Sequence, residues 1–117
     1  MKMYEYKGCG TCRKARAFLE ANGIEVDLIP IRETPPSKKE LKTMMASVDS
    51  SRKLFNTSGG DYKAMNLKDQ LPGMSEGDMI DLLASNGNLI KRPFLIGDGV
   101  ALVGFKEDQW SGLPGVS

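Results

Sequence analysis

The chain has 117 residues, 40% of them hydrophobic and 26% charged, which fits one domain with a core of its own. Sixteen Lys and Arg residues balance fifteen Asp and Glu residues, so the basic excess typical of nucleic-acid binding is missing. Histidine is absent, which excludes His-based acid–base catalysis, Cys–His nucleophile pairs and metal sites that need imidazole.

The sequence also contains no apolar run long enough to span a membrane. The N-terminal residues MKMYEYKG include no apolar segment of the kind that a signal peptide needs. We therefore expect a cytoplasmic protein, with a single domain over residues 1–117. We also expect a monomer that binds neither a membrane nor nucleic acid directly.

The first part of the chain predicts a strand, a helix and a second strand in succession. The alternating segment MYEYK predicts a short strand near residues 2–6, and from Cys9 onward the apolar spacing becomes helical. The β-rich segment IEVDLIPI predicts a strand near residues 25–30. The segment ETPPSKKEL then begins a second helix, because Ser37 and Glu40 are spaced as a capping box.

The second part of the chain starts irregularly. Residues 49–74 predict irregular structure, with a short helical piece near Arg52 and a flexible loop at NTSGGDYK. Ser75 then caps another helix. The segment NLIKRPFLIGDGVALVGF predicts two strands, near residues 93–97 and 100–104, joined by a hairpin turn at GDG. KEDQW predicts one last helical turn, and SGLPGVS predicts a frayed tail.

This order of elements predicts an α/β protein with thioredoxin-like topology. A right-handed β-α-β crossover makes the first two strands parallel, whereas the late hairpin brings antiparallel pairing. The result is a mixed four-stranded sheet. A helical insertion, at about residues 37–88, is expected between the second and third strands.

Cys9 and Cys12 are the only cysteines, and they lie where the first strand gives way to the first helix. They could hold a metal, form a structural disulfide, pack as small hydrophobes, or carry redox or nucleophilic chemistry. Two cysteines without histidine supply too few ligands, so we expect no metal, and a reducing cytosol disfavours a structural disulfide. Cys-x-x-Cys beside a β-α-β pattern is typical of redox-active thiols, and the Gly-rich turn argues against simple packing.

The position of each cysteine suggests its role. Cys9 at the helix start faces unpaired backbone N–H groups and the positive end of the helix dipole, which favour a thiolate nucleophile. Gly10 and Thr11 leave their amides open to an anion. Cys12, one turn later, is placed to resolve an adduct on Cys9, so the two are predicted to form a redox-active disulfide. Basic residues of the same segment add positive charge: Lys7, Arg13, Lys14 and Arg16.

Together with ETPPSKKEL and LIKRPFLIG, the segment CGTCRKARAFLE resembles the arsenate reductase (ArsC) family over residues 3 to about 110. It is especially similar to the branch that contains the Spx transcriptional regulators and uncharacterised ArsC-like proteins. FNTSGGDYK and LLASNGNLIKRP look most like the uncharacterised proteins. The resemblance implies a thioredoxin fold with an inserted helical subdomain.

The resemblance also implies site residues. In the glutaredoxin-dependent arsenate reductases a cysteine attacks arsenate and three arginines bind the oxyanion, and Cys9 and Arg92 match two of these residues. The other two arginine positions fall at or next to Asn56 and at Gly104, so the resemblance predicts weak oxyanion binding. Arg92 and Pro93 also resemble the X–cis-Pro element that pairs with substrates in thioredoxin folds. The alternative is a plain surface arginine followed by a proline that starts an edge strand.

Two classes of function follow. The first is an ArsC-family thiol–disulfide oxidoreductase with no bound cofactor, glutathione or glutaredoxin as electron donor, and a small thiol or redox protein as partner. The second is a Spx-like regulator that binds the RNA polymerase α-subunit and uses Cys-x-x-Cys as a redox switch. Residues 49–70 differ from the Spx segment and the C-terminal part is short, which favours the first class. A true arsenate reductase is the third alternative.

Overall fold

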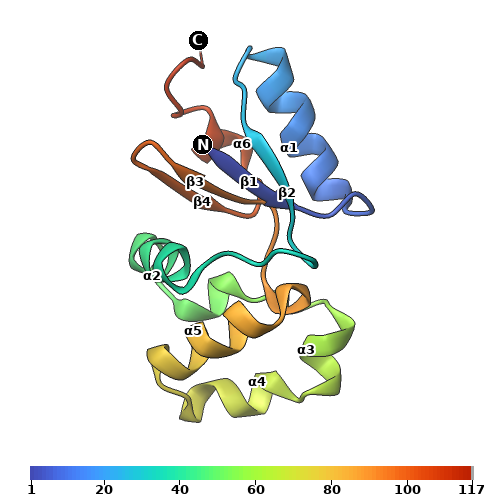
Figure 1. Ribbon diagram of the computed structural model, residues 1–117, viewed down its shortest axis with the longest axis vertical. Helices are drawn as coiled ribbons and strands as arrows, with labels where there is room; N and C mark the ends of the chain where they lie inside the picture. Colours follow the sequence, from blue (N-terminus) through green and yellow to red (C-terminus); the bar gives the residue numbers. More distant parts are fainter. Residues whose placement is uncertain (117) are drawn as a thin grey trace.

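In the computed structural model, which describes residues 1–116, a sheet covered by helices stands above a group of further helices (Figure 1). The sheet has the strand order β2-β1-β3-β4. β1 pairs in parallel with β2 and antiparallel with β3, which in turn pairs antiparallel with β4. This arrangement confirms the predicted mixed four-stranded sheet. The strands are β1 (Lys2–Glu5), β2 (Asp27–Pro30), β3 (Phe94–Gly97) and β4 (Val100–Val103).

Six α-helices lie in the described part of the chain. One of them connects β1 to β2, four lie between β2 and β3, and the last follows β4. Short 3-10 turns at Ser51–Leu54 (η1), Leu71–Gly73 (η2) and Gly87–Leu89 (η3) extend the segment between β2 and β3. The helices are α1 (Gly10–Ala21), α2 (Lys38–Ser47), α3 (Gly60–Ala64), α4 (Leu67–Gln70), α5 (Glu76–Ser85) and α6 (Glu107–Trp110).

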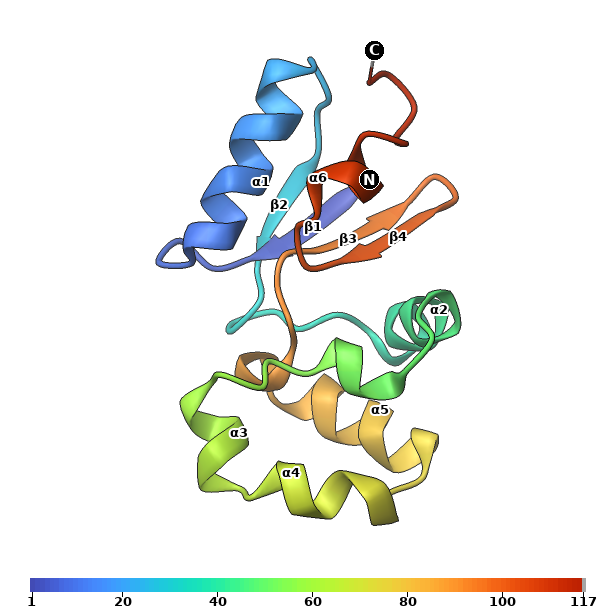
Figure 2. The same ribbon diagram turned by 180° about the vertical axis from the view of Figure 1, so that it is seen from behind.

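The two faces of the sheet build two cores, because successive side chains of a strand point to opposite faces. On one face Met3 and Leu95 pack with α1 and α6, in a cluster that includes the fully buried Trp110. On the other face Tyr4 and Phe94 pack with the helices that lie between β2 and β3. Figure 2 shows the sheet from behind, with α1 and α6 on the near side.

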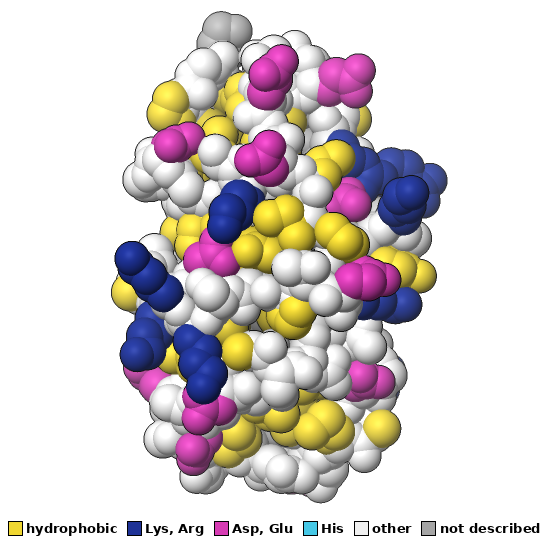
Figure 3. All heavy atoms as spheres, in the orientation of Figure 1, with side chains coloured by type: hydrophobic (Ala, Val, Ile, Leu, Met, Phe, Trp, Pro, Cys, Tyr) yellow, Lys and Arg dark blue, Asp and Glu magenta, His cyan; other side chains and the backbone are white. Residues whose placement is uncertain are grey.

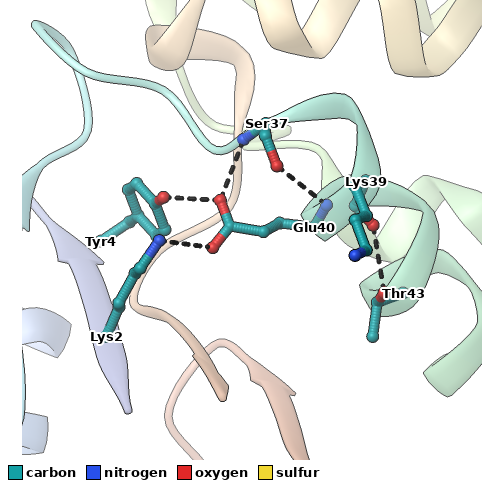
Figure 4. Close-up of polar contacts among 6 residues, drawn as sticks. All are labelled: Lys2, Tyr4, Ser37, Lys39, Glu40 and Thr43. Atoms are coloured by element: carbon teal, nitrogen blue, oxygen red, sulfur yellow. Dashed lines mark hydrogen bonds and ion pairs between the residues drawn. The ribbon is translucent and has the colours of Figure 1, made fainter.

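The start of α2 is joined to the sheet by a single carboxylate. Ser37 caps α2, and its hydroxyl and backbone exchange hydrogen bonds with Glu40, which confirms the predicted capping box. The Tyr4 hydroxyl donates to the same carboxylate at 2.6 Å and the Lys2 ammonium does so at 3.2 Å (Figure 4). Burial favours a higher pKa for Glu40, but hydrogen bonds from Tyr4, Ser37 and Lys2 outweigh it and lower that pKa.

Two predictions about irregular structure are wrong. Part of residues 49–74 is helical, since α3 and α4 form there and bury Tyr62 and Leu67 against the core. The tail is not frayed over residues 111–116, because Leu113 is buried beside Trp110. Ser117, the last residue of the predicted tail, lies outside the described residues. Within the described chain, no helix has the length and apolar character needed to cross a membrane.

Candidate functional site

The Cys9 side chain caps the N-terminus of α1. After β1 the chain turns at Tyr6, whose carbonyl accepts a hydrogen bond from the Cys9 backbone N–H at 3.0 Å. Cys9 is in the extended conformation of an N-cap residue, with φ −87° and ψ 116°. Its Sγ accepts a hydrogen bond from the Cys12 backbone N–H at 3.3 Å. The sulfur therefore occupies the position where the backbone of a helix start stabilises negative charge.

The two thiols differ in access to solvent. Both are free, and Cys9 is partly exposed whereas Cys12 is completely buried. An incoming reactant can reach only the Cys9 sulfur without a rearrangement of α1. The geometry thus separates an attacking position from a protected one within one helical turn.

The two thiols also differ in pKa. Burial favours a higher pKa for Cys9, but hydrogen bonds from Cys12 and Arg92 and the Arg92 charge outweigh burial and lower the pKa of Cys9. Burial, followed by the neighbouring Cys9 sulfur, raises the pKa of Cys12 well above the ordinary thiol value. Of the two thiols, Cys9 is therefore the one that loses its proton more readily.

Arg92 reaches the site from the opposite end of the sequence. The Arg92–Pro93 peptide bond is cis and leads directly into β3, and the Arg92 side chain interacts with the Cys9 sulfur at the start of α1. The Arg92 side chain is partly buried, and its Nη1 is buried without a hydrogen-bond partner among the described residues. Of the two alternatives for this pair, the edge strand is wrong, because β3 lies between β1 and β4.

The basic residues of α1 are placed differently from Arg92. Arg16 forms an ion pair with the buried carboxylate of Glu5, so its charge is neutralised away from Cys9. Arg13 and Lys14 are exposed on the helix surface. Figure 3 shows Lys and Arg side chains gathered at the edge of the molecule beside the start of α1. Positively charged side chains therefore lie near the site, but the cation that lowers the Cys9 pKa is Arg92.

The first turn of α1 is open above the cysteine. Gly10 and Thr11 are both exposed, and a methyl group added at Gly10 would meet no atom within 4 Å. This open space leaves room for an anion at the two residues, and the binding of an anion there stays a prediction. The two remaining family arginine positions offer no guanidinium: Asn56 is partly buried, and Gly104 is a buried glycine with φ +72°.

Sequence reasoning missed Tyr6 and Arg32. The Arg32 guanidinium carbon lies 3.8 Å from the centroid of the Tyr6 ring, and the Arg92 guanidinium carbon lies 5.1 Å from it. No local sequence motif indicates this arrangement, because the two arginines are far apart in the sequence: Arg32 follows β2 and Arg92 precedes β3. The parallel β1–β2 pair and the antiparallel β1–β3 pair bring both segments to the end of β1, where Tyr6 lies.

A pH series of alkylation should separate the two thiols. We expect iodoacetamide to label Cys9 before Cys12, with a half-maximal rate at a pH below the ordinary thiol pKa of about 8.5. The sign follows from the lowered pKa, since the thiolate is the reactive form and persists to lower pH. Arg92→Gln should move that midpoint upward. Peptide mapping by mass spectrometry gives both rates, and equal labelling or earlier labelling of Cys12 would contradict the assignment.

The comparisons with known proteins agree on one family. The model of the ArsC family matches residues 4–113. The uncharacterised protein YusI of Bacillus subtilis is 49% identical over 111 residues, which cover 94% of each chain. The global transcriptional regulator Spx of Enterococcus faecalis is 30% identical over 111 residues, covering 93% of this chain and 82% of that protein. These matches bear out the resemblance predicted from the sequence.

Two further matches belong to the same family: one is a relative with a named activity, and the other is a solved structure. The arsenate reductase of Rhizobium meliloti is 30% identical over 95 residues, covering 80% of this chain and 66% of that protein. The crystal structure of an ArsC family related protein from Bacteroides fragilis superposes with a TM-score of 0.89 at 40% identity. That superposition covers 95% of this chain and 96% of the other, which confirms the fold as that of the family.

Proposed function

Because the chain belongs to the ArsC family, we propose that it is a thiol–disulfide oxidoreductase in which Cys9 attacks and Cys12 resolves. The observation that carries the proposal is the inequality of the two thiols. Cys9 is accessible, caps a helix and has a lowered pKa, whereas Cys12 is buried one turn away with a raised pKa. The attacking thiol must be accessible and easily ionised, and the resolving thiol must lie within reach of the adduct that forms.

In the first step the Cys9 thiolate attacks one sulfur of a substrate disulfide. A Cys9–substrate disulfide forms, the substrate S–S bond breaks, and the other half leaves as a thiolate. In the second step Cys12 gives up its proton to solvent and attacks the Cys9 sulfur, which releases the second half of the substrate as a thiolate. The substrate has gained two electrons, and the protein now carries a Cys9–Cys12 disulfide.

Formation of the mixed disulfide in the first step makes Cys12 easier to ionise in the second. Burial is the main reason that the Cys12 pKa is high, and the adjacent Cys9 sulfur adds to it. Once Cys9 is part of a mixed disulfide it carries no negative charge, so this second contribution disappears. The Cys12 pKa then falls at the moment when its thiolate is required.

The cycle closes when a thiol donor reduces the Cys9–Cys12 disulfide, and we propose glutathione or a glutaredoxin in this role. No bound cofactor is needed, and the reducing cytoplasm is the compartment that would keep both thiols ready. The test is a coupled assay with hydroxyethyl disulfide, glutathione, glutaredoxin and glutathione reductase. The consumption of NADPH measures the rate. A rate no higher than that of the mixture without the protein would refute the oxidoreductase.

A second candidate function rests on the likeness to Spx. In this alternative the Cys9–Cys12 pair is a redox switch in a regulator that binds the RNA polymerase α-subunit. Immobilised α-subunit should then retain the protein, and oxidation should change the amount retained. Retention that is absent in both redox states, together with turnover in the coupled assay, would leave the oxidoreductase as the function.

We expect arsenate reduction to be weak. Two arginine positions of the arsenate reductases hold Asn56 and Gly104 here, and each lost charge-assisted contact costs about 1.5 to 3 kcal/mol. Their combined loss would weaken oxyanion binding by a factor of at least about 100. The measurement is glutaredoxin-coupled turnover against arsenate concentration. Saturation at micromolar arsenate would show that other groups, such as Lys91 or Lys106, replace the arginines.

A further inference from the structure

The Tyr6 ring contacts two guanidinium groups, and one of them, Arg92, acts on the Cys9 thiol. Arg32 lies over the ring at 3.8 Å and Arg92 at 5.1 Å from its centroid. Tyr6 is joined to Cys9 through the hydrogen bond between its carbonyl and the Cys9 N–H. An aromatic face attracts a guanidinium and orients it, so both cations are held on the residue whose carbonyl accepts the Cys9 N–H.

Neither cation forms an ion pair with a carboxylate within residues 1–116. The ion pairs of the described chain involve Glu5, Asp49 and Asp98, together with two further carboxylates on α2 and α5, and none of them includes Arg32 or Arg92. The buried Arg92 Nη1 also has no hydrogen-bond partner in this part of the chain. A buried donor without an acceptor is unfavourable, and an incoming anion would supply that acceptor.

Arg16 differs from Arg32 and Arg92, because a carboxylate neutralises its charge. It lies close in sequence to Cys9, yet its charge is already committed to the buried Glu5. The Tyr6 cluster therefore supplies positive charge that no carboxylate of the described chain neutralises, and its Arg92 member acts on the Cys9 thiol. Its Arg32 member is exposed and stands at a position that the family's oxyanion arginines do not occupy in the sequence.

We propose that Arg32 and Arg92, held on Tyr6, bind a carboxylate of the disulfide substrate while its sulfur reacts at Cys9. This inference rests on the proposed oxidoreductase and assigns its substrate class: small disulfides built from amino acids, which carry carboxylates. A guanidinium fork matches the two oxygens of a carboxylate. The contact is non-covalent, so the bonds and electrons exchanged at Cys9 and Cys12 are unchanged.

The test compares two disulfide reagents that differ in charge. Dithiobis(nitrobenzoate) carries a carboxylate on each ring, whereas dithiodipyridine is neutral, and both release a chromophore when a thiolate attacks. Single-turnover rates with the reduced protein are measured for both reagents at one pH, and their ratio is taken. Because both rates depend on the same Cys9 thiolate fraction, the ratio isolates recognition of the carboxylate.

We expect Arg32→Gln to lower the ratio about two- to fivefold, the range for a solvent-exposed charge contact. Tyr6→Leu should lower the ratio similarly because the stacking surface is lost, whereas Tyr6→Phe should retain it. Arg52→Gln, which removes one exposed positive charge elsewhere, is the matched control and should leave the ratio unaltered.

The outcomes distinguish this inference from the proposed function. If wild type reacts with both reagents and Arg32→Gln keeps the wild-type ratio, the carboxylate site is refuted while the reactive thiol stands. The same holds if Arg52→Gln lowers the ratio equally, since general charge would then be the cause. If wild-type Cys9 reacts with neither reagent faster than an unstructured cysteine peptide, the oxidoreductase itself fails.

Discussion

A Cys9→Ser variant is expected to lose all covalent reactivity toward disulfides, whereas Cys12→Ser should accumulate a stable mixed disulfide at Cys9. The reason is structural, because Cys9 and Cys12 are the only two thiols of the sequence. The Cys9 thiol is accessible, whereas the buried Cys12 thiol lies one helical turn away, where it can displace an adduct. Serine keeps the size of the side chain but is no nucleophile at neutral pH. Intact-mass spectrometry after exposure to oxidised glutathione gives the adduct directly.

Two controls make this experiment decisive. Circular dichroism should show that both serine variants keep the helical content of wild type, and peptide mapping should place the adduct. Adducts on Cys12 in the Cys9→Ser protein would reverse the two roles. Rapid release of the adduct by Cys12→Ser, at the rate of wild type, would show that Cys12 does not resolve it.

Gly87→Ala should destabilise the fold by about 3 kcal/mol. A Cβ at Gly87 would lie 1.9 Å from the Ile31 carbonyl oxygen and 2.8 Å from the Ile31 carbonyl carbon. Those atoms are backbone, so relief requires η3 and the segment after β2 to move apart. Urea unfolding monitored by Trp110 fluorescence measures the difference in the free energy of unfolding.

The matched control is Gly60→Ala at the start of α3. A methyl group there would meet no atom within 4 Å, and a compatible Gly→Ala change stabilises by about 0.4 to 1 kcal/mol. Equal free energies of unfolding for Gly87→Ala and wild type would contradict the close approach of the two backbones. The displaced segments carry Arg32 and lead to Arg92. The Cys9 pKa, which Arg92 lowers, should therefore be higher in the Gly87→Ala protein than in wild type.

The elements with local signals could be predicted from the sequence. Ser37 with Glu40 and Ser75 before α5 mark helix starts through side-chain hydrogen bonds that span only three residues. The hairpin between β3 and β4 follows from Asp98 and Gly99, which adopt the positive φ values that a tight turn requires. The Cys-x-x-Cys spacing marked Cys9 as the candidate nucleophile, and the structure places this residue at the N-cap of α1.

The missed elements depend on contacts distant in sequence. The segment around α3 and α4 contains Gly, Ser and Asn and has weak helical periodicity, yet it folds because Tyr62 and Leu67 are buried in the larger core. The tail is held by Leu113 in the cluster around Trp110. Tyr6 and Arg32 were missed for the same reason, since only the strand pairing brings them together with Arg92.

The Glu40 carboxylate has a consequence for how the molecule unfolds in acid. One side chain both closes the first turn of α2 and accepts hydrogen bonds from Tyr4 and Lys2 on β1. Because its pKa in the folded state is lowered, its contribution is full above the ordinary carboxyl pKa of about 4.3 and is lost as the pH falls through the folded pKa. Protonation therefore weakens a helix cap and a tie to the sheet in the same event. The sheet and the helices beneath it should lose structure together in a single cooperative acid transition, with no state in which one survives the other.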